Sequence, residues 1–267
     1  MTDHAARLLD RLTGIGPVAV AYSGGADSAL VLAAAVRVLG AARVLAVTAV
    51  SPSLASGELA PAGRLAAALG VRHLTPHTDE LAVAGYRANG RDRCYFCKST
   101  VLDAIVALAH DRGFATVATG TNADDAVDPF RPGIRAGVER GAHTPLRDAG
   151  LTKAAVRAVS REWGLATWDK PATPCLASRI RYGIPVTAER LARVDRAEQA
   201  VRAFLPVTDL RVRDLGDAVR VEVDAGRADP AAVADAVAAA GFPAGLPVQI
   251  GPYRSGALNH VVGHPAS

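Results

Sequence analysis

The sequence predicts an α/β protein in which helices cover both faces of a parallel sheet, followed by a smaller α+β unit. Three observations predict this fold class. Short apolar runs alternate with longer helix-like runs over the first two thirds of the 267 residues, a glycine-rich turn follows the first apolar run, and the pattern changes beyond Pro171, Pro174 and Pro185. Half of the residues are hydrophobic, enough for a sizeable core. We therefore expect two domains, residues 1–170 and 171–267.

Each element follows from the residues of its own run. Residues 1–16 carry charged side chains with leucines between them, which is typical of an amphipathic helix. Short apolar or β-branched runs predict strands, and longer runs rich in Ala and Leu predict helices. In the first domain we expect strands at 18–22, 43–50, 71–74 and 116–119, helices at 27–39, 58–69, 95–111 and 153–164, and an irregular segment at 124–148. In the second domain we expect a helix that begins at Thr187, strands at 210–212, 219–223 and 247–250, and a helix at 230–240.

Composition and charge narrow the classes of function. The formal net charge of +4 suits a small anionic substrate but does not predict a nucleic-acid surface, and aromatic residues are scarce. The apolar stretch at 29–36 is ended by Arg37 and falls far short of a membrane span of ~20 residues. The N-terminus does not resemble a signal peptide. We therefore expect a cytoplasmic protein without a membrane or nucleic-acid partner, whose three cysteines do not form a disulfide framework.

The turn after the first expected strand reads SGGADS over residues 23–28. Gly24 and Gly25 lack a Cβ and let backbone amides crowd round an anion, while Ser23 and Ser28 add hydroxyl donors. The following helix adds its N-terminal amides and dipole. Neither the Walker A pattern nor the dinucleotide-binding glycine pattern fits these residues. The turn predicts a nucleotide-binding loop, although a Gly-Gly turn in which Asp27 caps a helix explains the same residues.

A second polar loop follows another expected strand. Residues 120–125 read GTNADD and come directly after the run at 116–119. Ligands of open parallel sheets bind beyond the carboxyl ends of the strands. We therefore expect this loop and the SGGADS turn to lie at the same edge of the sheet.

The cysteines lie in basic, aromatic or proline-bounded motifs. Cys94 and Cys97 form a C-x-x-C in RCYFCK at 93–98, and Cys175 stands alone in PCLASR at 174–179. Three thiolates suit a 4Fe-4S cluster that leaves one iron open, and the neighbouring Arg93, Lys98 and Arg179 favour thiolates. A zinc site normally takes four ligands, so it would need a histidine, with His73, His77, His110 and His143 as candidates. Small buried hydrophobic cysteines are the remaining alternative.

Taken in order, these motifs resemble one family. The SGGADS turn is similar to the signature of the PP-loop ATP pyrophosphatases, which cleave ATP between the α and β phosphates. Together with RCYFCK, GTNADD and the DPFRPG that follows it, PCLASRIRYG and the later RVR at 211–213, it resembles LarE, the ATP-dependent sulfur transferase family of nickel-pincer nucleotide synthesis. The resemblance runs from about residue 15 to 225. It implies a PP-loop domain of the adenine nucleotide alpha hydrolase-like fold and a C-terminal sulfur-transfer and substrate domain.

The family's chemistry is implied by this resemblance alone. Members adenylylate the carboxylates of pyridinium-3,5-biscarboxylic acid mononucleotide, a small-molecule nucleotide substrate, and convert them to thiocarboxylates. In some members the equivalent of Cys175 gives up its own sulfur and becomes dehydroalanine. In others, a C-x-x-C and that cysteine bind a 4Fe-4S cluster whose open iron holds the sulfide. With Cys94, Cys97 and Cys175 present, the chain resembles the cluster type, supplied by a sulfur donor protein or by free sulfide. The resemblance also implies a homo-oligomer.

Site residues are carried over position by position. The nucleotide residues are Ser23, Gly24, Gly25 and Ser28 on the pyrophosphate of ATP, Asp27 and Asp124 on Mg²⁺, and Asn122 beside the nucleotide. Arg211 and Arg213 share one face of an expected strand and are implied to bind the substrate phosphate, although a solvated basic face explains the same spacing. Weaker candidates for that role are Arg131, Arg135, Arg179 and Arg181. Lys98 and Asp128 receive no role, and Glu198 is the candidate for an acidic residue expected in the first helix of the second domain.

Other classes of function remain open. A PP-loop tRNA thiolation enzyme should show a stronger basic surface or an added RNA-binding module. An amidotransferase or synthetase of the NAD or GMP type has no chemical use for the cysteines. A non-catalytic nucleotide-binding or metal-storage protein is the third alternative.

Overall fold

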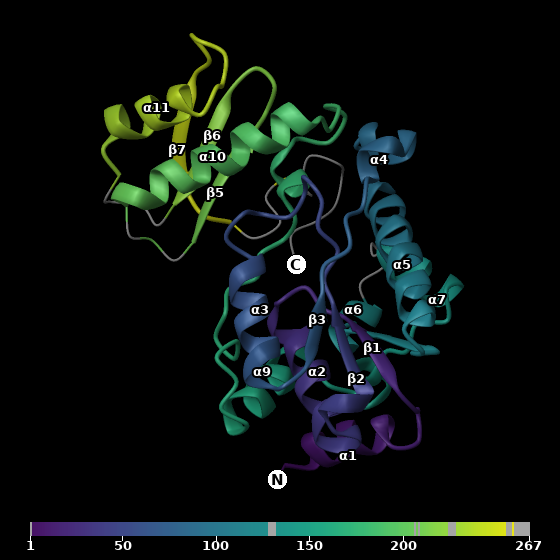
Figure 1. Cartoon of the computed structure of the whole chain (residues 1–267). Coiled ribbons are helices and arrows are strands. Elements are labelled where there is room, and N and C mark those ends of the chain that lie inside the picture. The colour runs from purple at the N-terminus through teal and green to yellow at the C-terminus, as the bar shows by residue number, and fades with distance from the viewer. Residues whose placement is uncertain are drawn as a thin grey trace. The chain divides into compact units, whose positions relative to one another are not determined.

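The chain folds into two compact units that are interleaved in sequence. The computed structural model in Figure 1 describes residues 2–127, 132–205, 207, 209–223, 228–254 and 258. The first unit comprises Met1–Ser51, Gly57–Glu80 and Asp92–Ala172, and the second comprises Pro52–Ser56, Leu81–Arg91 and Thr173–Ser267. The backbone therefore passes between the units five times, at 51/52, 56/57, 80/81, 91/92 and 172/173. The sequence predicted one boundary, after residue 170, and did not predict the first four of these crossings.

The first unit is built on a parallel sheet. Its strands are β1 (Val18–Ala21), β2 (Val44–Val47), β3 (Arg72–Leu74) and β4 (Thr116–Thr119), in the order β3-β2-β1-β4. Its helices are α1 (Asp3–Leu12), α2 (Ala26–Leu39), η1 (Ala41–Arg43), α3 (Leu59–Ala68), α5 (Arg93–Asp111), α6 (Ala123–Val127), α7 (Pro132–Glu139), α8 (Pro145–Asp148) and α9 (Lys153–Glu162). This arrangement confirms the predicted α/β fold class.

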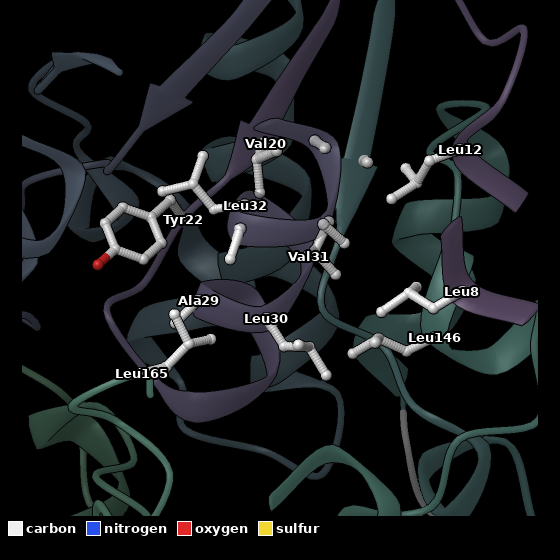
Figure 2. Close-up of a cluster of buried hydrophobic side chains, with 14 of the residues drawn as sticks. Leu8, Leu12, Val20, Tyr22, Ala29, Leu30, Val31, Leu32, Leu146 and Leu165 are labelled. Carbon is white, nitrogen blue, oxygen red and sulfur yellow. The ribbon is translucent and has the colours of Figure 1, made fainter. Parts of the chain in front are cut away.

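Helices cover both faces of this sheet because successive strand residues point to opposite sides. Val18 and Val20 of β1 belong to a core cluster shared with α1, α2, α3 and α9, whereas Ala19 belongs to a second cluster against α5. Figure 2 shows the first cluster, to which Leu8 of α1, Leu30 of α2 and Leu146 of α8 all belong. Helix α2 is buried throughout residues 28–35, so its N-terminal turn is fixed in place at the end of β1.

The segment at 124–148 was expected to be irregular, and this prediction is wrong. It contains α6, α7 and α8 in its described part. Two of these helices begin with proline, at Pro132 and Pro145, where the missing amide hydrogen costs nothing because first-turn amides have no partner within the helix. Helix α7 packs along α5, and a Cβ on Gly133 would lie 3.4 Å from the carbonyl oxygen of Cys94. The prolines and glycines that suggested a loop instead start helices and permit their close approach.

The second unit is a smaller α+β structure, also as predicted. Its strands are β5 (Leu210–Asp214), β6 (Val219–Val223) and β7 (Val248–Pro252), with β5 antiparallel and β7 parallel to β6. Its helices are α4 (Ala84–Arg87), η3 (Leu176–Arg179), α10 (Ala188–Phe204) and α11 (Pro230–Ala239), and the short turn η2 (Glu80–Ala82) lies at a crossing between the units. Helix α10 packs on β5 and α11 packs on β7. Over the described ranges, no helix combines the length and the hydropathy that a bilayer crossing requires.

The early segments of the chain are bound tightly into the second unit. Asn89 is fully buried with a φ of 54°, and its amide nitrogen donates to the carbonyl oxygens of Arg181 at 2.9 Å and Ile184 at 2.8 Å. Asparagine tolerates this left-handed conformation better than other residues with a Cβ. The backbone of Ser53 accepts a hydrogen bond from the amide of Leu176 at 2.8 Å. The contact of Ser53 holds the turn that carries Cys175, and those of Asn89 hold the chain just beyond it.

Candidate active site

The SGGADS turn joins the end of β1 to the start of α2, as a nucleotide-binding loop requires. Its hydroxyls hold the turn together: Ser23 Oγ lies 3.1 Å from Ser28 Oγ, and Ser28 Oγ donates to the carbonyl of Gly25 at 3.2 Å. Gly25 is the N-cap of α2 and has no side chain to hydrogen-bond the first-turn amides. Such amides, at the positive end of a helix dipole, suit a phosphate oxygen.

Two glycines permit this geometry. Gly24 has a φ of 74°, and a Cβ there would lie 3.0 Å from the Cβ of Ala62 in α3. Gly120 follows β4, and a Cβ on it would come within 2.7 Å of the backbone nitrogen of Ser28. The second contact brings the GTNADD loop against the first turn of α2. The two polar loops predicted to share one edge of the sheet therefore do meet.

Lys170 also reaches the SGGADS turn, and the sequence analysis missed it. Its Nζ donates to the carbonyl oxygen of Gly24 at 3.0 Å and to Glu58 Oε2 at 2.6 Å. Both side chains of this ion pair are about one-fifth exposed. Arg157 fixes the backbone of Lys170 by donating to its carbonyl oxygen at 2.9 Å. Lys170 lies outside every motif of the sequence, so only its spatial position reveals it.

Asp27 and Asn122 form the centre of the site. The Nδ2 of the fully buried Asn122 donates to Asp27 Oδ1 at 3.1 Å. Burial raises the pKa of Asp27, and the nearby Asp125 raises it further, while the hydrogen bond from Asn122 and the charges of Lys153 and Arg157 lower it. Asp27 is thus a partly desolvated carboxylate at the start of α2, surrounded by groups that compensate its charge.

Asp125, which received no role of its own from the sequence, also lies at this centre, whereas Asp124 has a different partner. Asn122 Oδ1 accepts from the amide of Asp125 at 3.0 Å, and Asp125 Oδ2 accepts from the amide of Asn122 at 3.3 Å. This reciprocal pair is a capping box, so the Asn-x-x-Asp spacing could have identified Asp125. Asp124 Oδ2 instead accepts from the amide of Lys153 at 2.8 Å, at the start of α9.

Cys94 and Cys97 lie in the first two turns of α5, three residues apart and so on one face of the helix. Neither forms a disulfide; Cys94 is exposed and Cys97 is half-buried. A guanidinium nitrogen of Arg93 lies 3.9 Å from Cys94 Sγ. Burial lowers the pKa of Lys98, while the neighbouring Cys97 and Asp125 raise it. Lys98 therefore interacts both with the C-x-x-C motif and with the loop that carries Asn122.

Cys175 belongs to the second unit and precedes the short helix η3. It is a free, half-buried thiol. Arg179, which is fully buried, donates to the carbonyl oxygens of Pro174 and Cys175, the latter at 3.2 Å. Its Nε and Nη2 bind the two carboxylate oxygens of Glu198 at 3.0 and 3.3 Å. Arg179 is thus engaged within the protein.

Arg211 and Arg213 lie beside the same turn. Both are almost completely buried, which excludes the alternative of a solvated basic strand face. Arg213 donates to the carbonyl oxygen of Ser178 at 3.2 Å and to Glu222 at 2.8 Å. Burial lowers the pKa of Arg211, as do the charges of Arg179 and Arg213, while Glu198 raises it. The second unit thus gathers three arginines around the turn of Cys175.

The remaining candidates are placed as follows. Arg181 pairs with Asp217 at 3.4 Å, and Arg135 lies over the ring of Tyr95. Arg131 and Asp128 lie outside the described residues. Among the residues that the structure describes, no three His, Cys, Asp or Glu side chains gather closely enough to hold a metal ion. Cys94 and Cys97 belong to the first unit and Cys175 to the second.

Comparison with known proteins adds two relatives. The chain is 36% identical over 222 residues to pyridinium-3,5-bisthiocarboxylic acid mononucleotide synthase of Lactiplantibacillus plantarum, covering 83% of this chain and 80% of that protein. It is 46% identical over 204 residues to an uncharacterized protein of Synechocystis sp., covering 76% of this chain and 75% of that protein. No family model matches the chain. Because each alignment is longer than either unit, the similarity extends into both.

Proposed function

This chain belongs to the LarE family, that of pyridinium-3,5-bisthiocarboxylic acid mononucleotide synthase, and we propose that it is an ATP-dependent sulfur transferase acting on pyridinium-3,5-biscarboxylic acid mononucleotide. The observation that carries the proposal is the 36% identity over 83% of the chain. The SGGADS turn, with Asp27 held by Asn122, supports the use of ATP.

The first step activates the substrate. A carboxylate resists nucleophiles because it is negatively charged and its leaving group would be oxide. Its oxygen attacks the α-phosphorus of ATP, a C–O–P linkage forms, and pyrophosphate leaves with the electron pair of the broken P–O bond. Such phosphorus chemistry depends mainly on positioning and charge stabilisation. The first-turn amides of α2 and the hydroxyls of Ser23 and Ser28 would orient the phosphates, and Lys170 holds the carbonyl of Gly24 in the turn.

A magnesium ion fits the carboxylates of this site. Asp27 and Asp125 each accept a hydrogen bond from Asn122, and Mg²⁺ commonly takes one or two carboxylates together with phosphate oxygens. Asp124 is a weaker candidate because one of its oxygens already accepts the amide of Lys153. When bound, the ion would neutralise the charge of the phosphates. The side-chain amide of Asn122 positions the carboxylate of Asp27 for the ion.

The second step transfers sulfur. Sulfide attacks the carbonyl carbon of the acyl-adenylate, the new C–S bond replaces the C–O bond, and AMP leaves, so that no electrons are gained or lost. Arg211 and Arg213 would bind the phosphate of the substrate mononucleotide. Cys94, Cys97 and Cys175 are not in disulfides, and Arg93 is close enough to Cys94 to favour its thiolate. These three cysteines would hold a 4Fe-4S cluster, which when bound supplies an open iron to carry sulfide.

A sacrificial route uses the same residues with a different sulfur source. The thiolate of Cys175 attacks the acyl-adenylate and AMP leaves. The Cβ–S bond of the resulting thioester then breaks as the α-proton departs, which gives the thiocarboxylate and dehydroalanine. The half-buried Cys175 at the arginine-lined turn favours this second candidate, which needs neither Cys94 nor Cys97.

The decisive experiment follows product, pyrophosphate and iron together. Anaerobically purified protein is incubated with ATP, Mg²⁺, sulfide and pyridinium-3,5-biscarboxylic acid mononucleotide. We expect ATP-dependent release of pyrophosphate, and a product whose mass reflects sulfur in place of oxygen. Iron and acid-labile sulfide that disappear in Cys94→Ser support the cluster route. Loss of one H₂S from Cys175 in iron-free protein supports the sacrificial route. Absence of both pyrophosphate and thiocarboxylate overturns the proposed function.

A further inference from the structure

Building on the proposed function, we propose that Arg179 is a positioning residue for Cys175: through Glu198, it fixes the backbone that presents the thiol. Arg179 and Arg213 both contact the turn at 174–179, but of these two arginines it is Arg179 that donates to the carbonyl of Cys175, which also accepts from the backbone amide of Ser178 at 2.9 Å. The proposal replaces the weaker assignment of Arg179 to substrate binding.

The guanidinium of Arg179 forms hydrogen bonds to two groups of partners. Its Nη1 donates to the carbonyl oxygens of Pro174 and Cys175 and to Ser178 Oγ, the last at 3.1 Å. Its Nε and Nη2 form the two-pronged pair with Glu198. A fully buried side chain with these partners offers no surface to a substrate. Its effect on the reaction must therefore pass through the turn that it holds.

Glu198 connects this arginine to the framework of the second unit. It lies on α10, and its Oε1 also accepts from the backbone amide of Val212 in β5 at 3.1 Å. The turn at 174–179 is thus connected through Arg179 to a helix and through Glu198 to a strand. On the other side, the amide of Leu176 is fixed by the carbonyl of Ser53. The backbone around Cys175 is held from both directions.

The energetics favour a role in geometry. Burying an ion pair removes two charges from water, and replacing such a pair by apolar residues is often neutral or stabilising, so the pair is weak support for stability alone. A displacement of ~1 Å at a reacting group can lower a rate by ~10²-fold. Lysine cannot substitute for arginine here, because an ammonium cannot pair in two prongs with Glu198 and also reach three acceptors on the opposite side.

The chain offers a matched control for the loss of a buried arginine. Arg193 lies on α10, the helix that also carries Glu198; it is nearly as buried as Arg179 and pairs with Asp214 of β5 at 3.0 Å. None of the contacts described for Arg193 involves residues 174–179. Arg193→Met therefore perturbs a buried ion pair of the second unit without releasing the turn of Cys175.

Two variants test the proposal in the full chain. Arg179→Lys keeps the charge and removes the forked geometry. Arg179→Met combined with Glu198→Gln removes both charges and keeps an oxygen for the amide of Val212, so the fold is preserved if the single variant proves unstable. The first readout is the ratio of thiocarboxylate formed to pyrophosphate released. We expect this ratio to fall roughly 10²-fold in both variants while pyrophosphate release falls far less, and to stay unchanged in Arg193→Met.

The second readout does not depend on the proposed function. The labelling rate of each cysteine with N-ethylmaleimide is measured by peptide mapping in reduced, iron-free full-length protein. Release of the turn should raise the rate at Cys175 roughly tenfold and leave Cys94 and Cys97 unchanged. If Arg179→Lys keeps both the product ratio and the labelling rate of Cys175, or if Arg193→Met alters them equally, the positioning role is overturned. If wild-type protein forms no product yet the labelling rate shifts as expected, only the proposed function fails.

Discussion

The amide of Asn122 donates to the carboxylate of Asp27 across 95 residues of sequence, at 3.1 Å. Asn122 follows β4 and Asp27 opens α2, so the contact joins the ends of two neighbouring strands. Burial disfavours the charged form of Asp27, and this hydrogen bond opposes that effect by lowering its pKa. The loop after β4 therefore tunes the carboxylate of the SGGADS turn.

Asn122→Ala should shift the pH dependence of pyrophosphate release. Removal of the hydrogen bond raises the pKa of Asp27 further, so less of it is ionised at a given pH and the acid limb of the rate profile moves to higher pH. Asp27→Ala should lower the rate by on the order of 10²-fold or more at every pH. Asp124→Asn is the control, because its partner is the amide of Lys153. An unchanged acid limb in Asn122→Ala, or a normal rate in Asp27→Ala, would contradict these assignments.

The sheet and the position of the site could be predicted because their signals are local. The strands β1 and β4 lie where apolar runs end in polar loops that contain glycine, and parallel strands bring such loops to one edge. The prediction of an irregular segment at 124–148 was wrong because its prolines were interpreted as helix breakers. Pro132 and Pro145 instead stand in the first turns of helices. Local composition alone does not separate these two roles of proline.

Contacts between distant residues were not predictable from local pattern. Lys170 lies 146 residues from Gly24, and no spacing rule connects them. The local pattern makes Arg179 a weak candidate for substrate binding, whereas its buried pairing with Glu198 depends on how η3 lies against α10. The segments 52–56 and 81–91 have no compositional mark that assigns them to the second unit. Such features arise from tertiary packing, which cannot be inferred from local patterns in a single sequence.

Gly120→Ala should destabilise the protein and impair the nucleotide loop. The added Cβ would lie 2.7 Å from the nitrogen and 3.0 Å from the Cα of Ser28, and both are backbone atoms that cannot rotate away. We expect a loss of about 1–3 kcal/mol in the free energy of unfolding, as for other overpacked positions, together with weaker ATP binding. Urea denaturation and ATP titration measure the two effects.

Gly63→Ala is the matched control within the same unit. Gly63 lies in the middle of α3, and a Cβ there would meet only His73 Nδ1 at 3.7 Å, an ordinary contact. Alanine in a helix interior should stabilise the protein by roughly 0.5–1 kcal/mol relative to glycine. If Gly120→Ala proved as harmless as Gly63→Ala, the close packing of the GTNADD loop on α2 would be refuted.

His73 should make the stability of the first unit sensitive to mild acid. Burial lowers the pKa of His73, whose Nε2 lies 2.8 Å from Thr48 Oγ1. Below its ordinary pKa of about 6.5 the unfolded chain binds a proton that the folded chain resists, so stability present above this pH is lost as the pH falls toward the lowered folded pKa. His73→Gln should flatten this loss in urea denaturation across the same pH range. A ring titration by NMR at or above the ordinary value would exclude this explanation.

Lys170→Met should weaken ATP binding through two effects. The carbonyl of Gly24 loses its donor, and the carboxylate of Glu58 remains without its counterion beside the phosphate loop. We expect the Kd for ATP to rise roughly tenfold, equivalent to about 1.4 kcal/mol, in a calorimetric titration. Lys170→Met combined with Glu58→Gln should recover part of the affinity, because the repulsive charge is removed as well. Since the two residues touch, their effects should not add, and strictly additive changes in the double-mutant cycle would show that the pair does not act as a unit at the turn.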